Sequence, residues 1–130
     1  MKTRRPQMVQ IGRLLKRADF LRVQGAGKKW VTPTCVVQMT PFLPPSGGSG
    51  FVCRYGLTIP KKIWKNAVDR NRVRRRVRAV ILGVLATATE QGKIPPGTDF
   101  VFLPRPPAHD APIDQIEKDL KWAIKRLMGG

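Results

Sequence analysis

Residues 70–85 read RNRVRRRVRAVILGVL, and this stretch combines a dense positive charge with a regular apolar pattern. The apolar residues recur at intervals of three and four, which places them on one side of an α-helix beginning near Val68. At about 100° per residue, Arg74 and Arg78 flank this stripe on one side, Arg72 and Arg76 flank it on the other, and Arg75 lies roughly opposite. The pattern therefore predicts a helix whose aliphatic side packs on a core while its arginines face outward. The stripe consists of Val73, Val77, Val80, Ile81, Val84 and Leu85.

The charge of the whole chain indicates a polyanionic partner. Twenty-five Lys and Arg against eight Asp and Glu give a formal net charge of +17. Repulsion on that scale disfavours a lone compact chain and attracts nucleic acid, with an anionic membrane surface as the alternative. No apolar run approaches the ~20 residues of a membrane-spanning helix, and the N-terminus lacks the features of a secretory signal. We expect a soluble, cytoplasmic protein that binds RNA.

The remaining chain reads as one α+β domain over residues 13–130, after a basic, flexible arm over residues 1–12. Apolar periodicity and Gly/Pro breaks predict the order α-β-β-β-α-β-α, if residues 28–31 count as a short strand. We expect the strands at 34–40 and 51–59 to pair as an antiparallel hairpin with a long tip. The expected elements are a helix at 14–23, strands at 28–31, 34–40, 51–59 and 99–104, and helices from 68 and over 113–128.

The residues that hydrolytic chemistry needs are sparse. His109 is the one histidine, the eight acids are scattered, and no Walker, GxSxG or CxxC motif occurs. Asp114 suits the N-cap of the last helix, and it shares a solvated helical face with Glu117 and Asp119. Cys35 and Cys53 suit buried thiols, with a disulfide between neighbouring strands as the alternative. We expect no catalytic residue and no metal ligand in this chain.

Residues 56–78, GLTIPKKIWKNAVDRNRVRRRVR, resemble the signature of the bacterial ribonuclease P protein family. In that family a strand is followed by a Lys-Lys pair, an Ala-Val pair and an Arg-Asn-Arg box on a helix. Similarity extends in order to residues 19–20, 36–38, 99–103 and 117–127, and so covers nearly all of the chain. The matching positions are Gly56, Lys61, Lys62, Ala67, Val68, Arg70, Asn71, Arg72, Arg75 and Arg78.

The resemblance implies a fold as well as a function. It implies a single mixed sheet of about four strands with three helices, similar to a ribosomal-protein domain, with a left-handed β-α-β crossover. It also implies a subunit of a ribozyme, in which a large RNA uses Mg²⁺ to remove the 5′ leader of precursor tRNA. The partners would be the ribonuclease P RNA and precursor tRNA, with no membrane and no small-molecule substrate.

The same resemblance implies two sets of RNA-contacting residues. One set faces the catalytic RNA, and the other holds the leader in a cleft between the first helix and the sheet. The chain departs from the family pattern at residues 63–66, about one residue longer than usual, and at Gln24 and Gln38, where aromatic residues are common. The first set is Lys61, Lys62, Arg70, Asn71, Arg72, Arg74, Arg75 and Arg78; the second is Phe20, Lys28, Lys29, Val36, Gln38 and Arg105.

Plainer interpretations of these residues stay open from the sequence. Phe20 and Val36 suit core positions, Trp64 suits a lid over the sheet, and Lys28 and Lys29 suit a solvated surface. A ribosomal or general RNA-chaperone protein, with no role in processing, would share the same charge and much of the same fold. A protein-only nuclease is disfavoured by the scattered acids.

Overall fold

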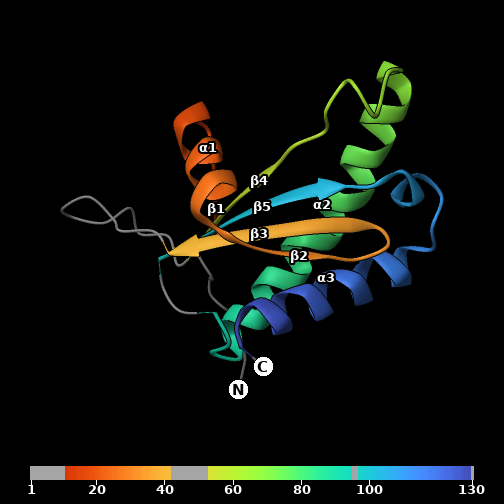
Figure 1. Cartoon of the computed structure of the whole chain (residues 1–130). Coiled ribbons are helices and arrows are strands. Elements are labelled where there is room, and N and C mark those ends of the chain that lie inside the picture. Colours follow the sequence, from red (N-terminus) through yellow and green to blue (C-terminus); the bar gives the residue numbers. More distant parts are fainter. Residues whose placement is uncertain (1–10, 42–52, 95–96, 130) are drawn as a thin grey trace.

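The computed structural model describes residues 11–41, 53–94 and 97–129 (Figure 1). Three α-helices, one short 3₁₀-helix and five strands make up this part of the chain. In chain order they are β1 (Ile11–Arg13), α1 (Arg17–Ala26), β2 (Lys28–Val31), β3 (Cys35–Pro41), β4 (Cys53–Leu57), α2 (Ala67–Glu90), β5 (Thr98–Pro104), η1 (Pro106–His109) and α3 (Ile113–Leu127).

The strands form one mixed sheet in the order β1-β4-β5-β3-β2. β1 and β5 run parallel to β4, whereas β3 runs antiparallel to both β5 and β2. The predicted α+β class is confirmed, and the sheet has five strands where about four were expected. The additional strand is β1, which places Ile11 and Gly12 in the domain and outside the predicted arm; residues 1–10 lie outside the described residues.

The predicted hairpin between the second and third expected strands is wrong. β5 lies between β3 and β4, pairing with β3 from Cys35↔Pro104 to Pro41↔Thr98 and with β4 from Cys53↔Thr98 to Leu57↔Phe102. β5 is apolar along most of its length and is buried on both faces, so the centre of the sheet is its stable position. β4, α2 and β5 therefore form a parallel β-α-β unit, and the predicted long tip lies outside the described residues.

One face of the sheet carries the main core. The predicted stripe of α2 is buried throughout, and it packs with α3 against alternate residues of the three central strands. Cys35, Val37 and Met39 of β3 point to this face, as do Phe100 and Phe102 of β5, because side chains alternate along a strand. The apolar stripe predicted for the last helix is also confirmed. Its buried members are Ile116, Leu120, Ala123, Ile124 and Leu127.

The opposite face carries α1 and a smaller apolar cluster. Val23 of α1 packs there with Leu14 and Val101, which are all buried. The prediction that this helix begins at residue 14 is wrong, because the Leu14 amide continues the β1 pairing by donating to the Tyr55 carbonyl at 2.8 Å. The helix consequently starts three residues later, and Leu15 and Leu21, expected on its apolar side, are 81% and 53% exposed.

The ends of the long helices follow capping rules, with one departure from the prediction. Asn66 caps α2, since its Oδ1 accepts from the Val68 amide at 2.8 Å. Gly92, with φ of 72°, follows the last turn of α2 in the left-handed conformation. α3 begins after Pro112, so Asp114 is not the N-cap; it lies within the first turn, where its negative charge still favours the helix dipole.

Both cysteines are buried thiols, as expected, and no disulfide joins them. β5 separates the strands that hold them, so the alternative of a bridge between neighbouring strands does not apply. Burial raises the pKa of Cys35 to about 12 and that of Cys53 to about 11. The two residues therefore act as small core side chains, with little thiolate at neutral pH.

Candidate nucleic-acid interface

The first turns of α2 present arginines on every side that the core does not cover. Val73 and Val77 are fully buried, whereas Asn71, two residues before Val73, and Arg75, midway between the two valines, are exposed. Arg75 lies opposite the buried stripe and makes no hydrogen bond or ion pair within the described part of the chain. The predicted orientation of the helix is thus confirmed, and Arg75 is the arginine most available to an external partner.

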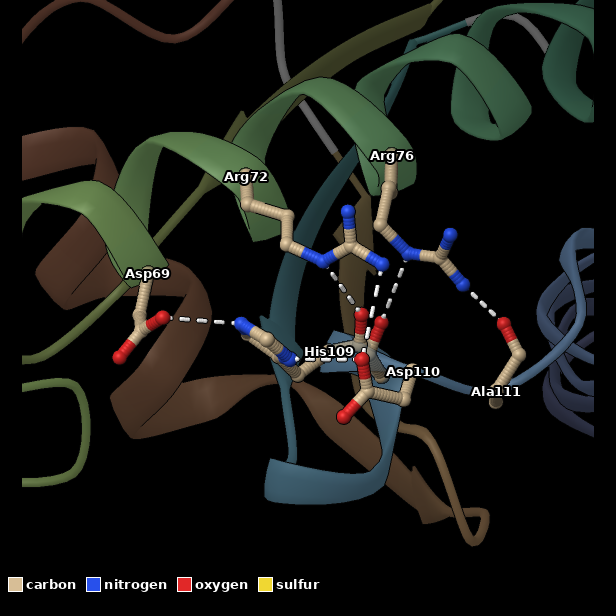
Figure 2. A network of polar contacts seen from close by, with 7 residues as sticks. Asp69, Arg72, Arg76, His109, Asp110 and Ala111 are labelled. Atoms are coloured by element: carbon tan, nitrogen blue, oxygen red, sulfur yellow. Dashed lines mark hydrogen bonds and ion pairs between the residues drawn. The ribbon is translucent and has the colours of Figure 1, made fainter.

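Arg72 and Arg76 lie on one flank of the buried stripe of α2 and hold the η1 segment (Figure 2). The Nε of Arg72 donates to the His109 carbonyl at 3.0 Å, and its Nη2 lies 3.5 Å from the Asp110 carboxylate. Arg76 donates through Nε to the Ala108 carbonyl at 3.2 Å and through Nη2 to the Ala111 carbonyl. These contacts were not predicted from sequence. They fix the two guanidinium groups and leave the remaining N–H donors of each for a ligand.

His109 joins η1 to the start of α2. Its Nε2 lies 2.9 Å from Asp69, its Nδ1 lies 3.0 Å from Asp110, and its ring stacks on Trp64 with centroids 6.2 Å apart. Hydrogen bonds to Asp110 and Asp69 raise the pKa of His109, and the bond to His109 lowers the pKa of Asp110. The one histidine therefore has a structural role between two acids, and Trp64 is a core residue that it covers.

The Lys61–Lys62 pair lies in an exposed turn directly before α2. Arg70 folds back onto this connection, because its Nη1 donates to the Trp64 carbonyl at 2.8 Å and to the Lys65 carbonyl at 3.2 Å. Asn71 accepts from Nη1 of Arg74 at 2.6 Å. The turn and the helix start are thus held as one basic surface, which we call the arginine surface. It consists of Lys61, Lys62, Arg70, Asn71, Arg72, Arg74, Arg75 and Arg78.

Arg78 differs from the other members of the arginine surface. Its Nε is buried and has no hydrogen-bond partner among the described residues, and its side chain as a whole is half-buried. The side chain thus lies along the flank of the helix with only its end near solvent. Arg78 is consequently less accessible than Arg75 one turn before it.

Four members of the second predicted set, Phe20, Lys29, Val36 and Gln38, lie on the α1 side of the sheet. Val36 and Gln38 of β3 point to this side because their neighbours in β3 enter the main core, and Gln38 is paired in register with Lys29. Lys28 is one residue away and points to the opposite face. The part of this side that α1 leaves uncovered, with Phe20, Lys29, Val36 and Gln38, is called the open face.

Phe20 borders the open face and lies over β4. A Cβ atom built at Gly56 would be 2.3 Å from the Phe20 ring, so only glycine lets the ring lie this close to the strand. Phe20 also packs on the apolar cluster of Val23 and Val101. It is therefore half-buried, which agrees in part with the core interpretation left open from sequence, and its contact with the leader stays a prediction.

A comparison with known protein families shows to which family the chain belongs. The sequence model of the family described as Ribonuclease P matches residues 8–128. The chain belongs to the ribonuclease P protein family. It is 34% identical to the ribonuclease P protein component of Paramagnetospirillum magneticum over 121 residues, which cover 91% of this chain and 84% of that one. It is 33% identical to the protein of the same name from Streptomyces bikiniensis, covering 91% and 93% of the two chains.

Solved structures of ribonuclease P proteins share this fold. The RNase P protein from Thermotoga maritima matches with a TM-score of 0.63 at 26% identity, covering 88% of this chain and 96% of that one. A Staphylococcus aureus RNase P protein matches with a TM-score of 0.58 at 24% identity, covering 88% and 93%. Membership makes the chain a subunit of an endoribonuclease that acts in tRNA processing, and it implies an RNA subunit as partner. Across the described residues, no helix has the length and apolar character needed to cross a bilayer.

Sequence reasoning missed a cluster of charged residues around the buried Asp99, which attaches α1 to the sheet in this ribonuclease P protein. Asp99 of β5 is fully buried and accepts from Arg54 of β4, at 2.9 Å from Nε and 2.8 Å from Nη2, and from Arg22 of α1. Asp19 of α1 lies 3.9 Å from Arg54. Hydrogen bonding to Asp99 raises the pKa of Arg54. Only the pairing of β4 with β5 brings these residues together, so no local signal in the sequence reveals the cluster.

Two other polar residues have structural partners that were not foreseen. Asp119 was expected on a solvated helix face, but it is buried and accepts from the Thr34 hydroxyl at 2.5 Å and from the Thr34 amide at 3.1 Å. Arg105, predicted to contact the leader, donates from Nη1 to the Thr32 carbonyl at 2.8 Å. Both residues therefore hold the β2–β3 turn, and Arg105 remains exposed.

Proposed function

We propose that this chain is the non-catalytic subunit of ribonuclease P and binds two RNA segments on two surfaces. The arginine surface contacts the catalytic RNA. The open face, with Arg105 at its edge, holds the 5′ leader of precursor tRNA and so assists removal of that leader. The cell compartment for this reaction is the cytoplasm.

The observation that supports the first contact is the division of α2 between an aliphatic side and a guanidinium side. Arginine can form paired hydrogen bonds with phosphate and can stack on an exposed base, which suits a folded RNA. Asp69 is bound to His109, and Asp110 is bound to His109 and lies 3.5 Å from Arg72, so within the described residues Arg72 is the one cation of this surface with an acidic partner. Each phosphate that the surface neutralises releases condensed counterions and makes binding sensitive to salt.

The open face has the composition expected for an unpaired strand. Phe20 supplies an aromatic ring at its border, Val36 supplies an apolar floor, and Lys29 supplies charge for a phosphate. Gln38 lies between Val36 and Lys29 on this face and is half-buried, and its Oε1 is buried without a hydrogen-bond partner among the described residues. Lys28, on the other side of β2, has no part in this contact.

The hydrolytic chemistry is assigned to the RNA. Among residues 11–41, 53–94 and 97–129, no three His, Cys, Asp or Glu side chains gather where they could hold a metal ion. His109 is held between two carboxylates, and Asp99 and Asp119 are buried with partners in the protein. We therefore assign the Mg²⁺ ions of the reaction to the RNA, and this chain supplies binding and orientation.

A reconstitution with purified RNA tests the proposal. Cleavage of precursor tRNA by the ribonuclease P RNA is measured over a series of Mg²⁺ concentrations, with and without the chain, on substrates with long and very short leaders. The expected result is stimulation at low Mg²⁺ that is larger for the long leader. A general RNA chaperone would stimulate both substrates alike, and cleavage by the chain after removal of all catalytic RNA would contradict the non-catalytic role.

A further inference from the structure

A groove far from the arginine surface lies between the second half of α2 and α3. It has a volume of about 710 Å³ and is lined from Val84 to Lys93 on one side and from Lys118 to Met128 on the other. From Arg72 to Ala88, the helix advances about 24 Å along its axis. The groove therefore lies at the opposite end of α2 from the arginine surface, and on the opposite side of the sheet from the open face.

The groove has an apolar floor and a basic rim. Val84, Ala88 and Ile124 form buried parts of the floor, and Trp122 lines it while remaining 50% exposed. Four lysines border the groove, and among the described residues no acid lines it. Glu117 pairs with one of them at 2.9 Å, which leaves a strong positive excess. The four are Lys93, Lys118, Lys121 and Lys125.

The indole of Trp122 packs against the guanidinium group of Arg126, which restrains it. The Arg126 guanidinium lies 5.6 Å from the Trp122 ring centroid and 5.1 Å from that of Trp30 on β2. Each such contact contributes about 0.5–1 kcal/mol at an exposed site. A large aromatic ring is thus fixed at the surface before any ligand arrives, so little conformational entropy is lost when a ligand stacks on it.

Charge limits what can occupy the groove. A second copy of the chain, at +17, would be repelled, and the unplaced segment 1–10 contains Lys2, Arg4 and Arg5 but no acid. An anionic ligand with flat apolar groups fits both the rim and the floor. Unpaired RNA has these properties, because a base can stack on an indole while its phosphates meet lysines. Thr87 and Gln91 add hydroxyl and amide groups at the α2 side for base edges.

We propose that this groove is a further RNA site, which binds an unpaired strand by stacking a base on Trp122 and placing phosphates on Lys118, Lys121 and Lys125. The three lysines span about 10 Å along α3, the length of about three stacked nucleotides. The site goes beyond the two surfaces proposed above, and it can be tested without the catalytic RNA.

Photocrosslinking of the full chain to a short oligouridine containing 4-thiouridine tests this site, with adducts mapped by mass spectrometry. The expected result is an adduct on the peptide that contains Trp122, in addition to adducts on the open face. Trp122→Ala should weaken binding at this site by roughly fivefold or more, and Trp122→Phe should retain much of it. Leu82→Ala, which removes an exposed apolar side chain that does not line the groove, is the control and should change nothing.

A pair of charge variants completes the design. The double variant Lys118→Gln, Lys125→Gln should reduce the adduct at Trp122. The double variant Lys16→Gln, Arg17→Gln also removes two positive charges, but outside the groove, and should leave the Trp122 adduct intact. Absence of the Trp122 adduct at concentrations that saturate the open face would overturn the proposal. Equal displacement of the RNA by a polyglutamate peptide of the same length would overturn it in favour of an acidic protein partner. Neither outcome affects the test of the arginine surface, which uses the catalytic RNA.

Discussion

The two faces of the sheet are stabilised by different interactions. The face under α2 and α3 is a continuous core of aliphatic and aromatic side chains, whereas the face under α1 has three buried apolar residues and a charge cluster around the buried Asp99. α1 also covers only part of its face. The comparison shows how one small sheet separates its tasks: the apolar face determines the fold and turns the arginines outward, and the charged face leaves strand surface available to a ligand.

The sharpest test of the apolar face is Val77→Asp. Val77 is fully buried in the middle of the α2 stripe, and a carboxylate there would lose its hydration without gaining a partner. We expect loss of the folded state, seen by circular dichroism as reduced helix content and no cooperative melting. Arg75→Asp, two residues away on the exposed side, is the control and should melt close to the parent. A folded Val77→Asp variant would contradict the orientation of the helix.

On the charged face, Asp99→Ala should have the next largest effect. The change leaves Arg54 without its principal partner and removes the attachment of Arg22 in α1. Arg54 and Arg22 keep some contact with solvent, so the free energy of unfolding in urea should fall by about 1.5–3 kcal/mol, the value of hydrogen bonds to a charged group. Asp114→Ala, at an exposed position, provides the control. An equal loss in both variants would show that the cluster does not fix α1.

Much of the apolar face could be predicted from sequence, because its signals are local. The stripes of α2 and α3 repeat with the period of a helix, and both are buried as expected. The insertion of β5 between β3 and β4 was not predictable in this way, since strand order depends on contacts between distant segments. The expected hairpin followed from adjacency in sequence, which the central position of the most apolar strand overrides.

In the candidate site too, local features could be predicted from the sequence, whereas contacts between distant segments could not. The outward direction of Arg75 follows from helical spacing alone. The attachment of Arg72 and Arg76 to the carbonyls of η1 depends on a loop more than thirty residues away, and the register of β2 with β3 determines that Lys29 and not Lys28 lies on the open face. The Asp99 cluster likewise requires the pairing of β4 with β5. Sequence reasoning therefore identified the charged groups but not the internal contacts that position them.

Gly56→Ala tests how closely α1 approaches the sheet. The new methyl group would overlap the Phe20 ring, and such overpacking costs about 1–3 kcal/mol. We expect a lower melting temperature and weaker stimulation of cleavage for substrates with long leaders. Gly83→Ala is the contrasting change, because its Cβ meets open space on α2, and it should stabilise the chain by about 0.5–1 kcal/mol. The same sign for both variants would contradict the packing.

The smallest expected effect is a pH dependence at η1. The folded-state pKa of His109 is raised, so its ion pairs with Asp69 and Asp110 stabilise the chain fully below the ordinary pKa of 6.5 and are lost as pH rises through the raised value. The lowered pKa of Asp110 keeps its side of the pair ionised down to strongly acid pH. The melting temperature of the parent should exceed that of His109→Gln at pH 5.5, and the difference should shrink at alkaline pH. A constant difference would exclude titration of His109 as its cause.

The salt dependence of binding to the ribonuclease P RNA tests the central claim most directly. The logarithm of affinity is measured against the logarithm of salt concentration for the parent, for Arg75→Ala and for Lys29→Ala on the open face. Loss of one phosphate contact should flatten the slope by about one unit. The account predicts a flatter slope for Arg75→Ala and an unchanged slope for Lys29→Ala. An unchanged slope for Arg75→Ala, with a flatter one for Lys29→Ala, would place the catalytic RNA on the other face of the molecule.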